Sequence, residues 1–366
     1  MRILITVPWG ECLGGAEEML QLVLDGAHET HHQLELVFTA GGPWPTELAD
    51  AGFRVDTIHA GRLRQARRSV ATILRLAQIF HRRQPDLILN WSGKAQLYGS
   101  PAAMLVGMTD RVVWWQHGIP GRDWPNRFPT ALPAKAIGCS SQAIARAQAR
   151  LSPFRSRFVV PPGTRVPDTG SGEAPLKLPP DIPVVGLVGR LQPWKGQDRL
   201  LRAHALLSEN GQRMHTVLVG GDAHGLSPEY AQNVPPLIDQ LDLTGAVTMT
   251  GQVPDAGPYI NQMDILVSAS DSEPFGIVLL EAMARGVPVV AVDSGGPAEF
   301  IQNGITGVLA RSGEPSALAD ALTALLASPA LRRTVGQAGR ERFMQDFTDV
   351  AMRKRFFDCL EALCQA

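Results

Sequence analysis

Short continuous apolar runs recur along the first half of the chain, and amphipathic stretches separate them. The runs are rich in β-branched residues and are bounded by turn-forming residues, which is typical of buried strands. They lie at residues 2–7, 34–40, 53–58, 85–91, 111–117, 136–140 and 157–162. Between them, apolar residues spaced three or four apart predict helices, as at 16–27 and 70–82. This alternation predicts a parallel sheet with helices on both faces.

A stretch rich in Pro and Gly at 161–183 interrupts the alternation and has no period, as in a linker between domains. The alternation then restarts, with strands predicted at 184–189, 215–221, 246–251, 264–270, 287–292 and 306–310. A helical pattern at 349–366 ends the chain. We therefore predict two doubly wound α/β domains at 1–165 and 184–345, a linker at 166–183 and a last helical segment at 346–366.

Composition places the chain among globular proteins with large cores. Of its 366 residues 45% are hydrophobic and 19% are charged. Four cysteines, at Cys12, Cys139, Cys359 and Cys364, form no CxxC pair, which favours a reducing compartment. The first apolar run is too short for a signal peptide, and no uninterrupted apolar stretch reaches the roughly eighteen residues of a membrane span. We expect a cytoplasmic protein.

Charge is divided unequally between the two halves. Residues 1–165 hold 19 Lys+Arg and 12 Asp+Glu, a net charge of +7, while the remainder carries −8. Within the basic half, residues 61–84 contain no acidic residue and seven arginines: Arg62, Arg64, Arg67, Arg68, Arg75, Arg82 and Arg83. The apolar stripe from Val70 to Phe80 is expected to pack on the sheet and leave these arginines outside. Such a face is either simply solvated or contacts anionic lipid headgroups or an anionic acceptor.

Three motifs follow predicted strands, where open α/β sheets bind their ligands. The first, GECLGGAEEML, places Gly14 and Gly15 just before a helix expected to begin near Ala16. Glycines there let the backbone approach a ligand, and the helix amides favour an anion. The dinucleotide fingerprint G-x-G-x-x-G is absent, so an ordinary strand–helix turn is the alternative.

The second motif, VGRLQPWKGQDRL, follows the strand that ends at Gly189. Arg190 and Lys195 stand at the mouth of this strand, and Gly196 opens a helix. Two cations near a helix N-terminus suit a diphosphate, with two solvated loop cations as the alternative.

The third motif, DSEPFGIVLLEAMARG, combines two glutamates with a glycine at a helix start. Pro274 suits the first helical turn, so the amides that follow would point to a second anion site. These are the amides of Phe275, Gly276, Ile277 and Val278. Glu273 would lie beside them, close to a leaving phosphate. Glu281 is expected to be buried and to need partners, either the hydroxyls of a nucleotide sugar or Arg285 one turn on.

Together these motifs resemble those of retaining GT-B-fold glycosyltransferases of family 4. SEPFGIVLLEAMARGVPVVA is similar to that family's E-x7-E signature, and GRLQPWKG to its G-R-x-x-x-x-K-G segment. LGGAEEML resembles its G-G-x-E turn, TGQVPD its base-side loop and GGPAEFIQNGITGVLA its downstream run, in which Gly295 and Gly296 precede a helix. The resemblance implies two Rossmann-like domains with a cleft between them and a C-terminal helix that returns to the first domain.

The resemblance also implies roles for residues of the second domain. Arg190 and Lys195 would hold the donor diphosphate, next to Gly189, and stabilise the departing phosphate. Glu273 would contact the donor sugar, and the amides near Gly276 would hold the sugar or phosphate. Glu281 would bind the ribose hydroxyls, and Val253 would lie against the base.

For the acceptor-binding first domain, the resemblance implies that Gly14 and Gly15 approach the phosphates. His117 matches a histidine that faces the donor sugar, although a capping or core histidine is the alternative. The acceptor would be a glycan, a lipid-linked molecule or a small metabolite. No nucleic acid is expected as a partner, and residues 61–84 are a candidate peripheral contact with the anionic inner face of a membrane.

The resemblance implies transfer of a hexose from a nucleotide sugar, with a UDP-hexose favoured, to an acceptor hydroxyl with retention of configuration, in bacterial surface glycan or glycolipid assembly. Cations and helix amides stabilise the leaving group, and its phosphate oxygen can accept the hydroxyl proton. The chain has no D-x-D triplet, so we expect metal independence and no cofactor. A sugar-nucleotide epimerase of related fold and a catalytically silent nucleotide-sugar binder remain alternatives.

Overall fold

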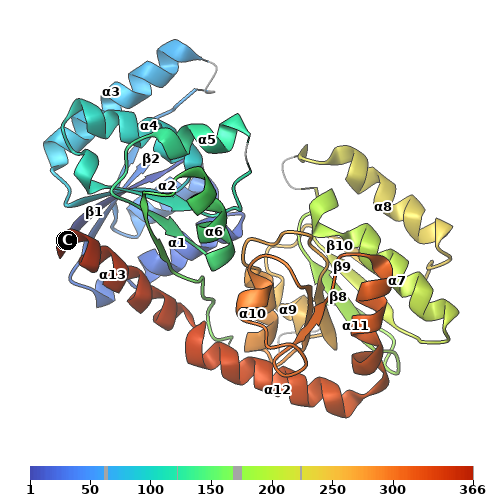
Figure 1. The fold of residues 1–366 in the computed structure, drawn as a ribbon. Helices are drawn as coiled ribbons and strands as arrows, with labels where there is room; N and C mark the ends of the chain where they lie inside the picture. The colour runs from blue at the N-terminus through green and yellow to red at the C-terminus, as the bar shows by residue number, and fades with distance from the viewer. Residues whose placement is uncertain (62–64, 122, 168–174, 223–224, 366) are drawn as a thin grey trace. The chain divides into compact units, whose positions relative to one another are not determined.

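The chain folds into two compact units (Figure 1). The computed structural model describes residues 1–61, 65–121, 123–167, 175–222 and 225–365. Unit 1 comprises Met1–Pro162 together with Asp349–Ala366, and unit 2 comprises Gly163–Thr348. The last segment of the chain therefore belongs to the same unit as the first.

Unit 1 is built on a parallel sheet of seven strands in the order β3-β2-β1-β4-β5-β6-β7. The strands are β1 (Arg2–Val7), β2 (Gln33–Phe38), β3 (Arg54–Thr57), β4 (Leu87–Asn90), β5 (Val112–Gln116), β6 (Ala136–Cys139) and β7 (Ser156–Val159). The order reverses at β1, so the loops after β1 and β4 flank a topological switch point.

Helices cover both faces of this sheet, as the alternation of patterns predicts. They are α1 (Gly15–Asp25), α2 (Pro43–Asp50), α3 (Ala66–Arg83), α4 (Gly93–Leu105), α5 (Trp124–Ala131), α6 (Gln142–Leu151) and α13 (Asp349–Gln365), with 3-10 turns η1 (Ala27–Glu29) and η2 (Thr109–Arg111). None of the helices in the described parts of the chain, in either unit, has the length and apolar character needed to cross a membrane.

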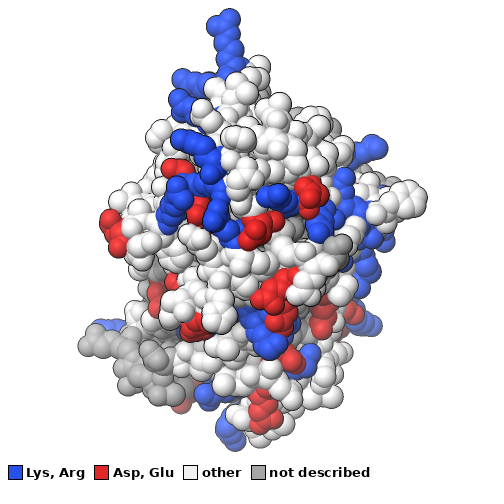
Figure 2. All heavy atoms as spheres, turned by 90° about the vertical axis from the view of Figure 1, so that its left-hand side faces the viewer, with Lys and Arg blue, Asp and Glu red and all other residues white. Residues whose placement is uncertain are grey.

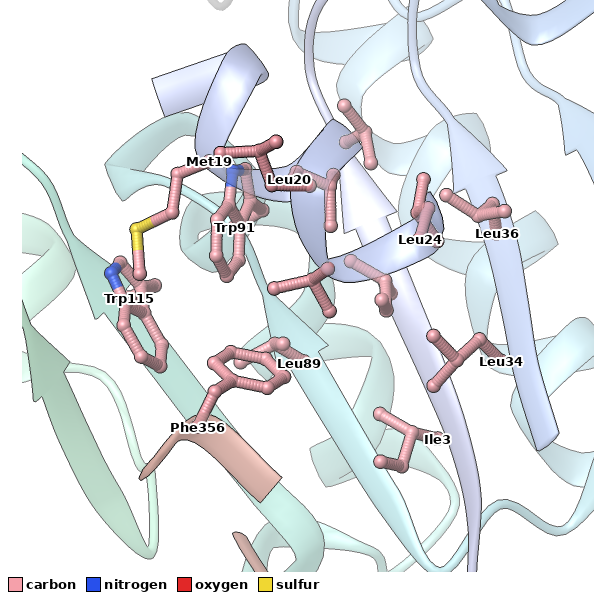
Figure 3. Close-up of a cluster of buried hydrophobic side chains, with 14 of the residues drawn as sticks. Ile3, Met19, Leu20, Leu24, Leu34, Leu36, Leu89, Trp91, Trp115 and Phe356 are labelled. Atoms are coloured by element: carbon pink, nitrogen blue, oxygen red, sulfur yellow. The ribbon is translucent and has the colours of Figure 1, made fainter. Parts of the chain in front are cut away.

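The main core of unit 1 lies between the sheet, α1 and α13. Figure 3 shows side chains of β1, β2, β4 and β5 meeting those of α1, with Phe356 of α13 reaching into the same cluster. The Phe356 ring centroid lies 5.2 Å from that of Trp115. Full burial of an aromatic or aliphatic side chain of this size stabilises a fold by about 1.5–3 kcal/mol. The helix α13 is therefore an integral part of the unit 1 core.

Unit 2 is built on a parallel sheet of six strands in the order β10-β9-β8-β11-β12-β13. The strands are β8 (Val184–Val188), β9 (His215–Val219), β10 (Val247–Gly251), β11 (Ile265–Ser268), β12 (Val289–Val292) and β13 (Val308–Ala310). Each of the thirteen predicted strands thus has a counterpart in one of the two sheets, and the predicted architecture of two parallel sheets is confirmed.

The helices of unit 2 are α7 (Gln197–Glu209), α8 (Pro228–Gln240), α9 (Gly257–Ile260), α10 (Ile277–Ala284), α11 (Pro315–Ala327) and α12 (Pro329–Asp346), with 3-10 turns η3 (Pro193–Lys195) and η5 (Pro297–Glu299). Part of the predicted linker is packed against this unit. Leu176 and Leu178 lie against one of its cores. The side-chain oxygen of Gln262 accepts a hydrogen bond from the amide of Leu176, and its side-chain nitrogen donates one to the carbonyl of Leu176.

The helix α3 corrects the expectation that all described arginines of 61–84 lie outside. Arg83 is buried and pairs with Glu35 of β2, with 2.9 Å between Arg83 Nη1 and Glu35 Oε2, and also with Asp56 of β3. Arg62 and Arg64 fall outside the described residues. The cause is position: Arg83 is the last residue of α3 and lies next to the buried Glu35 of β2.

Unit 2 holds two buried histidines, His204 of α7 and His215 of β9. His204 Nδ1 lies 2.9 Å from the hydroxyl of Thr216, and His215 Nε2 lies 2.8 Å from that of Thr248. Burial lowers the pKa of His204 to about 4, and repulsion from His215 adds to the effect. Burial also lowers the pKa of His215. Both imidazoles are therefore neutral at pH 7.

Acid should destabilise unit 2 through His204. Its pKa in the unfolded chain is 6.5, so the unfolded state binds a proton first as the pH falls. The free energy of unfolding should be constant above about pH 7 and decrease between about pH 6.5 and 4, with a loss of about 2 kcal/mol at pH 5 from this group. Urea denaturation of the protein and of His204→Gln at pH 7.5 and 5.0 measures the effect. An identical pH dependence of the two proteins would contradict the assignment.

Candidate functional site

The loops that carry the second and third motifs lie together at one edge of the unit 2 sheet. Strand β11 lies between β8 and β12, so the loops after these three strands are neighbours. They are the segments 189–196, 269–276 and 293–296. The structure thus brings Arg190 and Lys195, from one loop, to the same edge as Glu273, from the next.

A buried ion pair joins two of these loops. Lys195 Nζ lies 2.8 Å from Glu273 Oε2, and the two side chains are 17% and 10% exposed. The same carboxylate oxygen accepts a hydrogen bond of 3.0 Å from the hydroxyl of Ser270. The ammonium group also lies 4.1 Å from the ring centroid of Trp194, in a cation–π contact. Lys195 is therefore held between an aromatic face and a carboxylate.

Two glycines in left-handed conformation let the loops approach so closely. Gly196 has φ +75°, and a Cβ there would lie 2.5 Å from the carbonyl oxygen of Ala269. Gly295 has φ +70°, and a Cβ there would overlap the carbonyl oxygen of Glu273. The next amide, of Gly296, donates a 2.8 Å hydrogen bond to that same carbonyl. Side chains at 196 or 295 would push apart the segments that hold Lys195 and Glu273.

The helix α10 begins later than predicted. Gly276, with φ +98°, is the N-cap and Ile277 is the first helical residue, so Pro274 precedes the helix and is not in its first turn. Since a glycine cap has no side chain, it leaves the first-turn amides without a side-chain acceptor. These include the amides of Ile277 and Val278 that the sequence assigns to an anion.

Glu281 differs from its prediction. It is half-buried, although the residues around it, Leu279, Leu280, Ala282 and Met283, are buried. Position 281 lies on the partly exposed side of α10, together with Ile277 and Val278. Arg285 Nη1 donates a 2.9 Å hydrogen bond to the backbone carbonyl of Glu281.

The remaining predicted donor residues lie on neighbouring loops of unit 2. The side chain of Arg190 is half-buried, and its carbonyl accepts a 2.9 Å hydrogen bond from Gln197 Nε2. Gly189 follows β8 and lies beside Lys195, whose Cδ would lie 3.6 Å from a Cβ at 189. Val253, after β10, packs at the margin of a core cluster. The second glycine pair, Gly295 and Gly296, precedes only the 3-10 turn η5.

The predicted residues of unit 1 lie at the carboxyl edge of its sheet. Gly14 caps α1, which begins at Gly15, and both have the places expected from the sequence. A Cβ at Gly14 would lie 2.9 Å from Glu17 Oε2, so this helix start carries a carboxylate of its own.

His117 follows β5 and lies among tryptophans. Its Nε2 is 2.9 Å from the carbonyl oxygen of Trp91, and its ring meets those of Trp91 and Trp9 at centroid distances of 4.8 and 6.4 Å. Burial lowers the pKa of His117 to about 4, against a smaller opposing effect of the carbonyl. The imidazole is therefore neutral at pH 7, and with its Nε2 proton on Trp91 it offers Nδ1 as an acceptor.

Sequence reasoning missed two members of the unit 2 site. Ser270 and Trp194 both contact the Lys195–Glu273 pair. A signal existed for each: Ser270 ends the strand predicted at 264–270, and Trp194 is an aromatic residue next to a loop cation.

Comparison with known proteins points to a family of transferases. Residues 173–342 match the model of the family described as glycosyl transferases group 1. The lipopolysaccharide core biosynthesis glycosyltransferase LpsE of Rhizobium meliloti (strain 1021) is 25% identical over 355 residues, 95% of this chain and 96% of that protein. The D-inositol 3-phosphate glycosyltransferase of Nocardia farcinica (strain IFM 10152) is 36% identical over 187 residues, which cover 49% of this chain and 41% of the relative.

Solved structures resemble the whole chain. Anabaena HepE in complex with UDP-glucose matches with a TM-score of 0.82 and 24% identity, over 99% of this chain and 100% of that one. Sucrose-phosphate synthase from Thermosynechococcus elongatus matches with a TM-score of 0.84 and 22% identity, over 99% and 98%. These likenesses confirm the predicted GT-B fold. With the family match and the relatives, they support a glycosyltransferase.

Proposed function

We propose that the chain is a retaining, family 4 glycosyltransferase that moves a hexose from a UDP-hexose to an acceptor hydroxyl in surface glycan or glycolipid assembly. One observation carries the proposal: Lys195 and Glu273 meet at 2.8 Å at the carboxyl edge of the unit 2 sheet. A cation that would bind a leaving diphosphate, Lys195, thus lies next to a carboxylate that would bind a sugar hydroxyl, Glu273. The UDP-glucose bound to HepE supports the choice of donor.

The residues of this edge divide the chemistry between them. Arg190, Lys195 and the first-turn amides of α10 would stabilise the charge that develops on the phosphate as the glycosidic bond breaks. Glu273 would accept hydrogen bonds from the hexose hydroxyls, and Glu281 from those of the ribose. Val253 would lie against the base.

Retention follows if the acceptor hydroxyl attacks from the side that the phosphate leaves. The departing phosphate oxygen then takes the hydroxyl proton, so no separate basic side chain is needed. Gly14 and Gly15 of unit 1 would approach the phosphates. His117 is neutral at pH 7, so it would offer the substrate a hydrogen bond and not a charge. Because protein cations and amides would stabilise the leaving group, transfer should proceed without a metal ion.

A donor screen followed by product analysis tests the proposal. UDP-glucose, UDP-galactose, UDP-N-acetylglucosamine and GDP-mannose would be compared in a thermal-shift assay. A ligand at about one hundred times its Kd raises the free energy of unfolding by about 2.7 kcal/mol. The stabilising donor, radiolabelled, would then be incubated with glycan and lipid-linked acceptors with and without EDTA. Transfer with retained configuration in EDTA supports the proposal, whereas an epimerised nucleotide or binding alone would replace it with one of the alternatives.

We also propose that α3 holds the enzyme reversibly on anionic membrane. Its exposed face carries Arg67, Arg68, Arg75 and Arg82, and also Val70 and Leu74, which are 55% and 56% exposed. Figure 2 shows basic side chains at the top of the face that it draws, whereas basic and acidic ones are mixed over the rest of that face. A helix face that combines cations with apolar side chains suits the boundary of an anionic bilayer.

Sedimentation with liposomes measures this contact. Each cation near an anionic leaflet contributes about 1 kcal/mol, so changing Arg67 and Arg68 to Gln should weaken partitioning by roughly 30-fold. Binding should need anionic lipid and weaken with salt. Changing Arg202 and Arg213 of unit 2, both exposed, to Gln removes equal charge and should change little. Equal partitioning onto neutral and anionic vesicles, or onto neither, would refute the proposal.

A further inference from the structure

Arg199 contacts both loops that carry the Lys195–Glu273 pair. It lies in the first turn of α7, where its amide bonds the carbonyl of Gly196 at 3.1 Å. Its Nη1 donates a 2.9 Å hydrogen bond to the carbonyl of Ala269 and pairs with Asp271, and its Nη2 donates to the carbonyl of Pro193 at 3.2 Å. One guanidinium group therefore joins two segments that are more than seventy positions apart in the chain.

Each of these contacts is a short step from the site. Pro193 begins the turn η3, which ends at Lys195. Ala269 and Asp271 begin the loop that leads to Glu273. The side chain of Arg199 is 17% exposed, as is that of Lys195, so both are largely withdrawn from water. Because a guanidinium is planar and its donors are fixed in direction, it constrains the distance between the two loops more tightly than a lysine could.

Two further loops of unit 2 lie against Asp271 and Arg199. The hydroxyl of Ser294, after β12, bonds the carbonyl of Asp271. After β13, a Cβ at Gly313 would lie 2.5 Å from Asp271 Oδ1 and 2.7 Å from Arg199 Nη1. The absence of a side chain at 313 thus leaves the room that the Arg199–Asp271 pair occupies.

Stability alone explains this arrangement poorly. A cation in the first turn of a helix faces the positive end of the helix dipole, which is unfavourable. Asp271 is 61% exposed, and pairs with so exposed a partner contribute little to stability. What the contacts do achieve is a second connection between the loop of Lys195 and the loop of Glu273, besides the Lys195–Glu273 pair itself.

We propose that Arg199 is a positioning residue, which holds Lys195 and Glu273 at the separation that donor binding and leaving-group stabilisation require. The proposal rests on the proposed function for its kinetic consequence. Misplacing catalytic groups by about an ångström can cost up to roughly 10²-fold in rate. Removing the contacts of Arg199 with the two loops should therefore lower kcat more than it raises the KM for the donor.

Kinetics of Arg199→Met test the consequence, with Arg202→Met as the matched control. Arg202 lies three residues on in α7 and is exposed. We expect kcat to fall roughly tenfold in the first variant and to stay unchanged in the second. Arg199→Lys keeps the positive charge but loses the planar guanidinium and its fixed donors. It should therefore restore only part of the kcat that Arg199→Met loses. Gly313→Ala, which crowds the pair without removing it, should lower kcat in the same direction.

A double-mutant cycle separates positioning from general stabilisation. If Arg199 acts through Lys195, then Arg199→Met in a Lys195→Ala background should lower kcat by less than twofold, because the group to be positioned is gone. Additive losses, or a lower melting temperature with normal kcat, would show that Arg199 only stabilises unit 2 and would overturn the proposal.

Amide hydrogen exchange of the protein without ligand gives a readout that does not depend on catalysis. The amides of Lys195 and Gly296 bond the carbonyls of Gln192 and Glu273. Both should exchange faster in Arg199→Met than in the wild type or in Arg202→Met. Faster exchange in a protein that transfers no sugar would refute the proposed function alone. Unchanged exchange in an active enzyme would refute the role of Arg199 alone.

Discussion

Replacing Lys195 with alanine is expected to lower kcat/KM for glycosyl transfer by roughly 10²-fold or more, on the scale of losing one preorganised electrostatic contact. The structure gives the reason. The ammonium group of Lys195 lies 2.8 Å from Glu273 and against the ring of Trp194. Because the Lys195 side chain is only 17% exposed, water screens its charge poorly. The variant also leaves the Glu273 carboxylate buried with Ser270 as its described neighbour. Steady-state kinetics with the donor identified by the thermal-shift screen measures the effect.

Lys177→Ala is the matched control, because Lys177 is an exposed lysine of unit 2 outside this edge, and its activity should be normal. Arg190→Ala should show a loss like that of Lys195→Ala, since both cations are assigned to the diphosphate. Full turnover in both Lys195→Ala and Arg190→Ala would refute that assignment. A melting temperature measured for each variant distinguishes lost chemistry from lost folding.

Replacing Glu35 with alanine is expected to destabilise unit 1 by about 3 kcal/mol, because removing one partner of a buried ion pair leaves a buried charge without compensation. Glu35 and Arg83 have side chains only 1% and 6% exposed, and their atoms meet at 2.9 Å. Asp56 would still pair with Arg83, which keeps the loss at the lower end of the usual range. Urea denaturation at neutral pH gives the free energy of unfolding.

Arg54 provides an internal control for this prediction. It also pairs with Glu35, but at 3.4 Å and with a side chain 62% exposed. Pairs of this exposed kind contribute about 0–1 kcal/mol, so Arg54→Ala should be nearly neutral. Equal losses in the two variants would mean that burial of Arg83 is not the cause.

The sequence predicts the strands of this protein well because both sheets are covered by helices. A strand buried on both faces must be apolar along nearly its whole length, and such runs are visible without any alignment, as at Val184–Val188 and Val289–Val292. The same reasoning locates the loops that hold the site, because ligands of parallel sheets bind where strands end.

The sequence does not predict which side chains of distant loops contact each other. One motif identifies Arg190 and Lys195 and another identifies Glu273, but the contact of Lys195 with Glu273 depends on β11 lying beside β8, an order that no pattern of apolar residues specifies. Glu281 and Arg83 show the converse error. An apolar flank suggested burial for Glu281, and a run of cations suggested exposure for Arg83. Burial is decided by which side of a helix meets the sheet, and local composition does not report it.

The helix α13 has a consequence for how the protein is made. Arg353 bonds the carbonyl of Leu22 and pairs with Glu29, more than three hundred positions earlier in the chain, and Phe356 completes the first hydrophobic core. Chains emerge from the ribosome N-terminus first, and domains generally fold as units once their residues are available. Unit 2 consists of one uninterrupted segment, whereas unit 1 needs its last helix. Synthesis of unit 1 therefore begins first, but its core is complete only after α13 has been translated. Until then, while about half of the protein is translated, that core lacks the side chains of α13 that cover it.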